Sequence, residues 1–377
     1  MKILHLSDLH LGKRVNEFSL IEDQAYILDE IVDIATRECP DAVIVAGDVY
    51  DKAVPPAEAV QLMDDFLCRL AELKLPTFVI SGNHDSAERL SFASRLIDLS
   101  GIHLSPTYSG TVAPVVLKDE YGEVAFYLLP FVKPVHVRQC FPDEEIATYT
   151  DAVRTAVEQM GLEAGRRNVL VAHQFVTGAT AAGSEELSVG GLDNVDMGVF
   201  DAFDYVALGH IHGAQQVGRA TVRYSGSPLK YSFAEARQHK SVTLVELREK
   251  GTVEVRMVEL HPLRDMRELR GTFDEIASRR FMPGEKKDDY MHITLTDEED
   301  VADAIGQLRL VYPNLMRLDY DNRRTRATAI PLSAEEMKKP IELFAELYEL
   351  QNGQPMSEEQ RQYAERLIEE VFGGVES

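Results

Sequence analysis

Five short apolar segments within the first 212 residues each run directly into side chains of the kind that bind metal ions. Their length is that of buried strands, and helical patterns lie between the early ones, which predicts an alternating α/β fold. In such folds ligands bind beyond the carboxyl ends of the strands. The segments and the polar residues that follow them are Leu4–Leu6 with Asp8 and His10, Ala42–Ala46 with Asp48, Thr77–Ile80 with Asn83, His84 and Asp85, Val169–Ala172 with His173, and Tyr205–Leu208 with His210 and His212.

A metal site explains this pattern better than separate local roles do. Each polar residue alone could be a cap, a turn residue or a hydrogen-bonded core group, and a lone histidine after a strand usually is one of these. Five such coincidences in one chain are far less expected. Asp8 and His10 are two positions apart, so they would project to the same side if the chain stays extended there.

The candidate ligands combine two carboxylates, one amide oxygen and four imidazoles. This mixture favours manganese, iron or zinc over calcium, whose sites are built from oxygens, and manganese is the first choice. Asp48 could bridge two ions. The candidate ligands are Asp8, His10, Asp48, Asn83, His173, His210 and His212.

The expected chemistry is hydrolysis of a phosphate ester by two divalent ions. Their four positive charges exceed the two negative charges of Asp8 and Asp48, and the surplus could hold a phosphodiester. Ions about 3.5–4 Å apart can share a hydroxide that attacks phosphorus in line. His84 is not needed as a ligand, so it is the candidate catalytic residue that stabilises the transition state and protonates the departing oxygen. Asp85 could orient His84, and an N-cap for a helix that starts near Ser86 is an equal alternative.

The length of 377 residues predicts one large domain with a smaller appendage. Strand patterns at Ser241–Leu247 and Val253–Val258 would complete the core, and Pro262 marks a boundary. Beyond it, strand patterns at Met291–Leu295 and Met316–Tyr320 flank a helical stretch at Val301–Leu310, enough for a small α/β module.

Acidic helices are expected at the C-terminal end. They open with capping-box patterns, Ser333 with Glu336 and Ser357 with Gln360. The expected domains are therefore residues 1–261, 262–332 and 333–377.

The net charge of −24 works against binding to a polyanion, because nucleic-acid affinity rests largely on lysine and arginine. The acidic excess is uneven, with 23 basic and 38 acidic residues in 1–261, 12 and 14 in 262–332, and 4 and 11 in 333–377. Bound metal ions would add local positive charge. Three cysteines without paired spacing, no secretory signal and no membrane span predict a cytoplasmic protein.

Taken together, these motifs resemble the signature of the calcineurin-like metallophosphoesterases. The matching stretches are Asp8-Leu9-His10, Gly47-Asp48-Val49-Tyr50-Asp51, Gly82-Asn83-His84-Asp85, His173 and Gly209-His210-Ile211-His212. The resemblance implies a four-layer α-β-β-α core in which Asp48 bridges the two ions. It assigns Asp8, His10 and His212 to the first ion, Asn83, His173 and His210 to the second, and the catalytic role to His84.

A narrower resemblance, to the SbcD nuclease subunits, rests on three further stretches. They are Ser7 to Lys13, Val206 to His212, and Gly226-Ser227-Pro228-Leu229-Lys230-Tyr231-Ser232-Phe233 with Glu235. The last has an ordinary alternative as a turn between strands. This resemblance implies a manganese-dependent hydrolase that acts as an exonuclease on duplex DNA ends and as an endonuclease on single strands or hairpins, in DNA repair, recombination and replication.

The same resemblance implies a homodimer, a small capping domain that helps to hold DNA, and an SbcC-like coiled-coil ATPase as partner. It would place the protein at the nucleoid when it is on DNA. A stand-alone phosphoesterase for a small nucleotide or a phosphoprotein is the alternative enzyme, and it would leave the C-terminal helices unexplained. A catalytically dead scaffold should have lost ligands, whereas all seven ligand positions and His84 are filled.

Three surface hypotheses each have an ordinary alternative. An apolar stripe could form a dimer contact, but its helical period favours packing on the protein's own sheet. An arginine cluster could touch the DNA backbone or lie in a solvated turn. The C-terminal apolar faces could dock on the ATPase or pack on the protein's own core. The residues concerned are Met63, Phe66, Leu67, Leu70, Leu90, Ala93 and Ile97 for the stripe, Arg323, Arg324 and Arg326 for the cluster, and Ile341, Phe344, Leu347, Tyr348, Tyr363, Leu367, Ile368 and Val371 for the helices.

Overall fold

The computed structural model describes residues 1–181, 183, 185, 193–278, 286–299, 301–322, 340–352 and 354–374. The chain divides into two compact units, Met1–Asn322 and Arg323–Ser377. No helix within the described ranges is long and apolar enough to cross a membrane.

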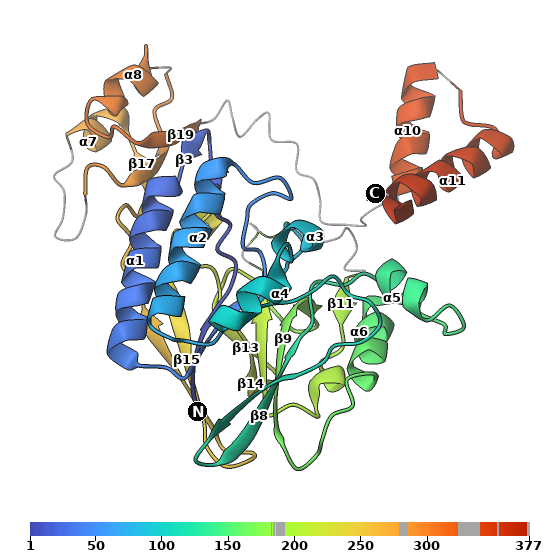
Figure 1. The fold of residues 1–377 in the computed structure, drawn as a ribbon. Helices are drawn as coiled ribbons and strands as arrows, with labels where there is room; N and C mark the ends of the chain where they lie inside the picture. The colour runs from blue at the N-terminus through green and yellow to red at the C-terminus, as the bar shows by residue number, and fades with distance from the viewer. Residues whose placement is uncertain are drawn as a thin grey trace. The chain divides into compact units, whose positions relative to one another are not determined.

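Two six-stranded sheets form the body of the first unit (Figure 1). Strands β1, β4, β5 and β6 run parallel in one sheet, and β14, β12, β9 and β8 run parallel in the other. Because parallel strands share a direction, their carboxyl ends lie at one edge of each sheet. In sheet order, the strands are β16 (Val253–Glu259), β15 (Ser241–Leu247), β1 (Lys2–Leu6), β4 (Ala42–Ala46), β5 (Thr77–Ile80) and β6 (Ile102–Leu104), then β13 (Gln215–Val217), β14 (Arg219–Tyr224), β12 (Tyr205–Gly209), β9 (Arg167–His173), β8 (Gly122–Leu128) and β7 (Val115–Asp119).

Side chains that alternate along the strands build three apolar layers. Ile44 and Val171 lie in the layer between the two sheets. Val43 packs in a second layer with helices α1 (Ile21–Glu38) and α2 (Ala57–Glu72). Leu170 packs in a third layer with α6 (Tyr149–Glu158). Since successive strand residues point to opposite faces, this arrangement follows from the sequence period, and the predicted four-layer α-β-β-α core is confirmed.

Short elements connect and flank these layers. Among them, the single turn η3 matters most for the site. The short elements are β2 (Arg14–Val15), β3 (Phe18–Ser19), α3 (Ala87–Leu90), α4 (Ser94–Ile97), η1 (Asp98–Ser100), α5 (Pro134–Cys140), β10 (Phe175–Val176), β11 (Asn194–Val195), η2 (Met197–Phe200) and η3 (Phe233–Glu235).

A small module with its own apolar core follows β16. Three parallel strands, β17 (Met266–Gly271), β18 (Tyr290–Leu295) and β19 (Leu315–Tyr320), carry helices α7 (Phe273–Ala277) and α8 (Ala304–Arg309). The two strands predicted here are confirmed as β18 and β19, and α8 lies inside the helical stretch that was expected.

The second unit contains helices α10 (Pro340–Asn352) and α11 (Glu358–Gly374). Ser357 forms the expected capping box, because its backbone N–H donates to Gln360 Oε1 at 2.9 Å and the Gln360 N–H donates to Ser357 Oγ at 3.3 Å. The capping box expected at Ser333 and Glu336 lies outside the described residues.

The α2 part of the apolar stripe packs on the protein's own sheet, as its helical period favoured. Met63, Phe66 and Leu70 are 2%, 1% and 0% exposed and belong to the layer that covers β1, β4 and β5. Leu67 and Leu90 pack against the same layer. The three buried side chains are therefore not available to a contact surface.

A buried ion pair joins the two sheets at the amino end of β9. Arg167 donates to both carboxylate oxygens of Asp119, the last residue of β7. It also donates to the carbonyl of Leu247, the last residue of β15, and to the carbonyl of Arg248, the next residue. Arg167 is only 3% exposed. Since β9 ends with His173, this pair lies at the opposite end of the strand from the candidate metal site.

Candidate metal centre

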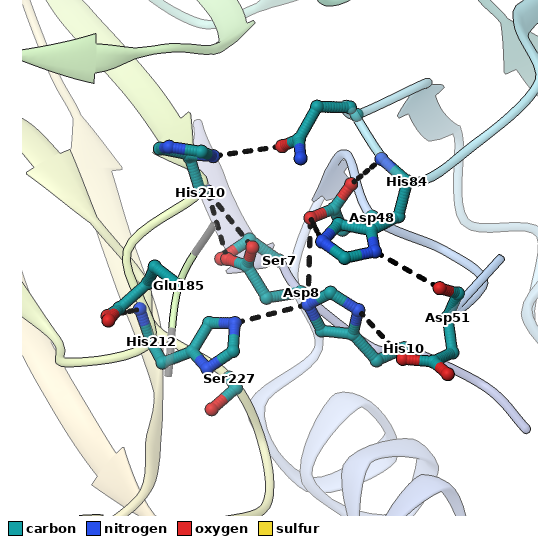
Figure 2. Close-up of polar contacts among 12 residues, drawn as sticks. Ser7, Asp8, His10, Asp48, Asp51, His84, Glu185, His210, His212 and Ser227 are labelled. Atoms are coloured by element: carbon teal, nitrogen blue, oxygen red, sulfur yellow. Dashed lines mark hydrogen bonds and ion pairs between the residues drawn. The ribbon is translucent and has the colours of Figure 1, made fainter. Parts of the chain in front are cut away.

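All seven predicted ligands lie at the carboxyl ends of strands, and the fold brings them together. Figure 2 labels Asp8, His10, Asp48, His210 and His212 among them. Asp8 and His10 follow β1, Asp48 follows β4, and Asn83 follows β5 in the first sheet. His173 ends β9, while His210 and His212 follow β12 in the second sheet. Six of the seven are buried, and Asn83 is half-buried. The site therefore spans the edges of both sheets.

The carboxylate of Asp48 lies at the centre of the cluster. Its Oδ2 atom is 3.5 Å from His10 Nε2 and 3.3 Å from His173 Nε2, two histidines that come from different sheets. Its Oδ1 atom accepts the backbone N–H of His84 at 2.9 Å. A Cβ atom added at Gly82 would lie 2.1 Å from Asp48 Oδ1, so the approach of the two loops requires glycine there. This geometry suits a carboxylate that bridges two ions.

Asn83, His173 and His210 form one group of converging ligand atoms. Asn83 Oδ1 lies 3.1 Å from His173 Nε2 and 2.9 Å from His210 Nδ1. Adjacent ligands held about 2.1 Å from one octahedral ion are about 3 Å apart, so these spacings fit a shared ion. His173 Nδ1 donates to the carbonyl of Ala46 at 2.8 Å, which leaves the Nε2 lone pair for a metal.

Asp8, His10 and His212 form the second group. His10 Nε2 lies 3.1 Å from His212 Nε2, and an oxygen of Asp8 lies within 4.8 Å of both rings' ligand atoms. The Asp8 carboxylate also accepts the backbone N–H of His210 at 3.0 Å. Two ring nitrogens that face each other at this distance present lone pairs to a common point. The residues present therefore fit a second ion.

Burial and charge shift the pKa values of these groups in different directions. Burial holds the pKa of His10 well below its usual value and lowers the pKa of His210 to about 3, so both imidazoles are neutral. Burial alone would also lower the pKa of His173, but Asp48 raises it to about 9. Burial opposes the charge of Asp48, yet the neighbouring histidines hold its pKa well below the usual range. In the metal-free centre an ionised Asp48 thus lies beside neutral imidazoles of His10 and His210 and a protonated imidazole of His173.

The expectation of an extended chain at Asp8 and His10 is wrong. Strand β1 ends at Leu6, and Asp8 and His10 have φ angles of 53° and 43°, in the left-handed region. Asp48 and His210 also have positive φ angles, of 49° and 103°. Such backbone costs about 1–3 kcal/mol per residue and gathers at functional sites. Here the turned backbone aims both side chains inward.

His84 lies beside the cluster, with its ring turned toward the bridge. Its Nδ1 donates to the carbonyl of Asp51 at 3.0 Å, and its Nε2 is 3.9 Å from Asp48 Oδ2. His84 is half-buried, so its ring borders both the ligands and solvent. This placement suits a side chain that meets a substrate. The ligand atoms of His84, His10 and Asp48 also lie within 4.8 Å of one another, close enough to share a metal ion.

Asp85 braces the two loops that carry Asp48 and Asn83. Its carboxylate accepts the backbone N–H groups of Val49, Tyr50 and Gly82 at 3.0, 2.9 and 2.9 Å. The N-cap alternative is wrong, because Ser86 caps α3 through its hydroxyl. The geometry favours a role in which Asp85 positions the His84 loop.

Three polar residues around His212 were not predicted as site residues. Glu185 Oε1 accepts the backbone N–H of His212 at 2.9 Å, and Glu235 Oε1 lies 3.2 Å from His212 Nδ1. Lys240 donates to the carbonyl of His212 at 2.9 Å. Only Glu235 had a sequence signal, as the end of a resembling stretch. The predicted DNA-contact arginines, Arg323, Arg324 and Arg326, lie outside the described residues.

Comparison with known proteins gives two family matches. The calcineurin-like phosphoesterase model matches residues 1–214, and the model described as the Type 5 capsule protein repressor C-terminal domain matches residues 262–352. A relative from Staphylococcus epidermidis, the SbcD chain of the nuclease SbcCD, is 34% identical over 322 residues, which cover 84% of this chain and 85% of the relative.

Solved structures show a weaker likeness. A Thermus thermophilus protein is 12% identical with a TM-score of 0.38, and it covers 68% of this chain and 98% of its own. A dimetal phosphatase from Danio rerio is 11% identical with a TM-score of 0.37, covering 70% and 98%. These likenesses are too weak to bear on this chain.

Manganese binding should strengthen as the pH rises toward about 9. Below that pH the metal-free protein keeps a proton on His173, and this proton must leave before the imidazole can bind a metal. The affinity should rise by about tenfold per pH unit for one displaced proton and level off once His173 is neutral. Calorimetry at several pH values, in buffers of different ionisation enthalpy, measures both the affinity and the released protons. An affinity that does not change between pH 7 and 9 would contradict the role of His173 as a ligand.

Proposed function

The chain belongs to the SbcD nuclease family within the calcineurin-like phosphoesterases, and we propose that it is the nuclease subunit of a complex that cleaves DNA. The observation that carries this proposal is the position of Asp48 between His10 and His173, with two groups of ligand atoms on either side. Such a pair of sites suits a two-metal hydrolase of phosphodiester bonds.

The described side chains divide the work of phosphodiester cleavage between them. Asp48 would bridge the two ions, while Asp8, His10 and His212 would hold one ion and Asn83, His173 and His210 would hold the other. When bound, two divalent ions, which we propose to be manganese, supply a hydroxide and stabilise charge on phosphate oxygens. His84 faces the reacting phosphate and protonates the departing oxygen. Asp85 keeps the His84 loop against the loop of Asp48 through its three backbone hydrogen bonds.

The proposed substrate is DNA, as duplex ends for exonuclease action and as hairpins or single strands for endonuclease action. The relative is named as one subunit of SbcCD, which supports the proposal that this chain also has a partner subunit. We propose that this partner is a coiled-coil ATPase that controls access to the site. Residues 1–261 would form the nuclease domain, 262–332 the DNA-capping domain and 333–377 the partner-docking helices. The complex would act in the cytoplasm, at the nucleoid.

His84→Ala should abolish DNA cleavage while both ions remain bound, because His84 lies beside the ligand set without belonging to it. Asp48→Ala should lose metal as well as activity, because its carboxylate lies between both groups of ligands. End-labelled duplex and hairpin DNA with manganese measures cleavage, and calorimetry measures the ions bound. If His84→Ala loses an ion, then His84 is a ligand and its catalytic role is rejected.

We also propose a homodimer that is formed by the surface next to α3 and α4. Phe92, Leu96 and Leu99 are 80%, 73% and 87% exposed, and they lie within eight residues of one another. Large apolar side chains grouped on a surface mark interaction sites.

Leu96→Glu together with Leu99→Glu should convert a dimer into a monomer. Two charges placed within an apolar contact would be desolvated without a partner. Light scattering at micromolar concentration measures the mass, and Ile305→Glu on α8, which is also exposed, is the matched control. A wild-type protein that is monomeric without its partner would reject an autonomous dimer.

Within the second unit, α10 and α11 leave several apolar side chains uncovered by each other. Leu343, Phe344 and Leu347 on α10 are 56%, 45% and 55% exposed, and Tyr363 on α11 is 59% exposed. Ile341 and Ala364 are buried. Amphipathic helices that present such faces dock on apolar partner surfaces. We propose that the ATPase covers this face.

Phe344→Asp together with Leu347→Asp should abolish co-purification with the ATPase while manganese binding and intrinsic cleavage persist. The charges would oppose burial of the α10 face in the partner. Leu310→Asp, which changes an 87% exposed leucine of the small module, is the control and should keep the partner. Undiminished binding by the α10 variant would show that this face is not the docking surface.

A further inference from the structure

A buried carboxylate and a buried ammonium lie next to the candidate metal centre and have no part in the function proposed so far. Glu235, at the end of η3, is 0% exposed, and Lys240, just before β15, is 7% exposed. They form an ion pair with each other. Charges are rarely buried unless they are paired, and such a pair adds little stability beyond what apolar residues would give. A role other than stability is therefore worth seeking.

The pair holds both the side chain and the main chain of one predicted ligand. Glu235 Oε1 lies 3.2 Å from His212 Nδ1, and Lys240 Nζ donates to the carbonyl of His212 at 2.9 Å. Glu235 Oε1 also accepts the backbone N–H of Tyr231 at 3.3 Å, and Lys240 Nζ lies 2.9 Å from Ser227 Oγ. The pair is thus fixed from several sides, with His212 held between its members.

This support distinguishes His212 from the other histidine ligands of the cluster. Nδ1 of His173 donates to the main-chain carbonyl of Ala46. Nδ1 of His210 faces the amide oxygen of Asn83, and Nδ1 of His10 is 4.0 Å from the nearest oxygen of Asp51. Among these four ligands, all in the described part of the chain, His212 alone has a carboxylate within hydrogen-bond distance of Nδ1.

We propose that Glu235 is the positioning residue that orients His212 for the ion held with Asp8 and His10, and that Lys240 fixes Glu235 in that role. This inference rests on the proposed two-ion function. A carboxylate at Nδ1 keeps the ring hydrogen on that nitrogen and leaves the Nε2 lone pair facing His10. The partial negative charge it induces makes Nε2 a stronger donor to a cation.

The same interactions explain the stretch from Gly226 to Glu235. Gly226 has a φ angle of 80°, and a Cβ atom there would lie 2.7 Å from the carbonyl oxygen of His212. Ser227 donates to the carbonyl of Leu229 at 2.7 Å, and the Ser227 N–H donates to the carbonyl of His212 at 3.1 Å. A plain turn between strands would need none of these contacts with a metal ligand. The stretch is therefore part of the support for His212.

Glu235→Gln in the full-length protein tests the proposal. Manganese titration by calorimetry should show one site weakened by about 10–100-fold while the other keeps its affinity. Electron paramagnetic resonance should show the paired-ion signal of the wild type replaced by that of a single ion at limiting manganese. Neither readout requires DNA cleavage. Asp119→Asn is the matched control, because it also removes one carboxylate of a buried ion pair, with Arg167 at the far end of β9. It should lower the melting temperature and leave both manganese sites unchanged.

The unpaired ammonium left by Glu235→Gln could by itself prevent folding, so a second variant is required. Glu235→Gln with Lys240→Met removes both charges and should fold, and it should still show one weakened site. Wild-type affinity at both sites in either folded variant would overturn the proposal, as would an equal loss in Asp119→Asn. A wild-type protein that binds no manganese would instead reject the proposed function itself.

Discussion

The ionised carboxylate of Asp48, buried among histidines from both sheets, is the constraint on which the site depends. A buried negative charge is unfavourable unless positive groups or hydrogen bonds surround it. In the protein these are the His84 backbone N–H and the rings of His10 and His173. Each partner lies at or just after the end of a different strand, so the position of Asp48 links the ends of β1, β4, β5 and β9. Two divalent ions would neutralise the negative charge of Asp48 more completely than the imidazole rings do.

Backbone strain at the strand ends is the second part of this arrangement. Asp8, His10 and Asp48 all have left-handed backbone, which an L-residue adopts at a cost. Hydrogen bonds between the loops offset this cost, because the Asp8 N–H donates to Gly47 and the His10 N–H donates to Asp48. The loops after β1 and β4 therefore hold each other in conformations that neither would adopt alone. Rigid loops keep ligand atoms about 3 Å apart before any ion arrives, which is the preorganisation that a metal site requires.

The sequence was sufficient for the parts of the site that depend on strand ends. An apolar segment followed by a ligand residue predicts the position of that residue, because parallel strands end at one edge, and this rule located Asp48, His173 and His210. It could not predict the conformation after the strand, so the backbone at Asp8 and His10 was wrongly expected to be extended. A hydrophobic pattern likewise cannot tell whether the apolar face of a helix packs on the protein's own sheet or on another molecule. For α2 the helical period favoured the protein's own sheet.

Residues that support a ligand carry almost no local sequence signal. Glu235 is 23 positions from His212, and the two meet only because η3 folds back beneath the loop after β12. Asp85 was noticed because it adjoins His84, but its backbone partners at Val49 and Tyr50 depend on the pairing of β4 with β5. Such long-range contacts follow from tertiary structure and could be inferred here only through the resemblance to a known family.

The segment that supports His212 also contacts the small module, so the two are mechanically linked. Phe233 of η3 packs against His292 of β18 with ring centroids 5.3 Å apart, and Lys230 pairs with Asp265, just before β17, at 2.7 Å. A shift of the small module would thus reach η3, and Glu235 lies at the end of that element.

The distribution of charge suggests how an acidic protein can act on a polyanion. In the small module Arg264, Arg267 and Arg270 all form ion pairs with acidic side chains, so they leave little net positive field. The net charge of −24 would itself repel a DNA backbone. We propose that the surplus charge of bound ions and a partner protein supply much of the attraction. On this view the nuclease centre engages a phosphodiester only when a partner brings DNA to it, which would limit cleavage to DNA that the complex has already selected.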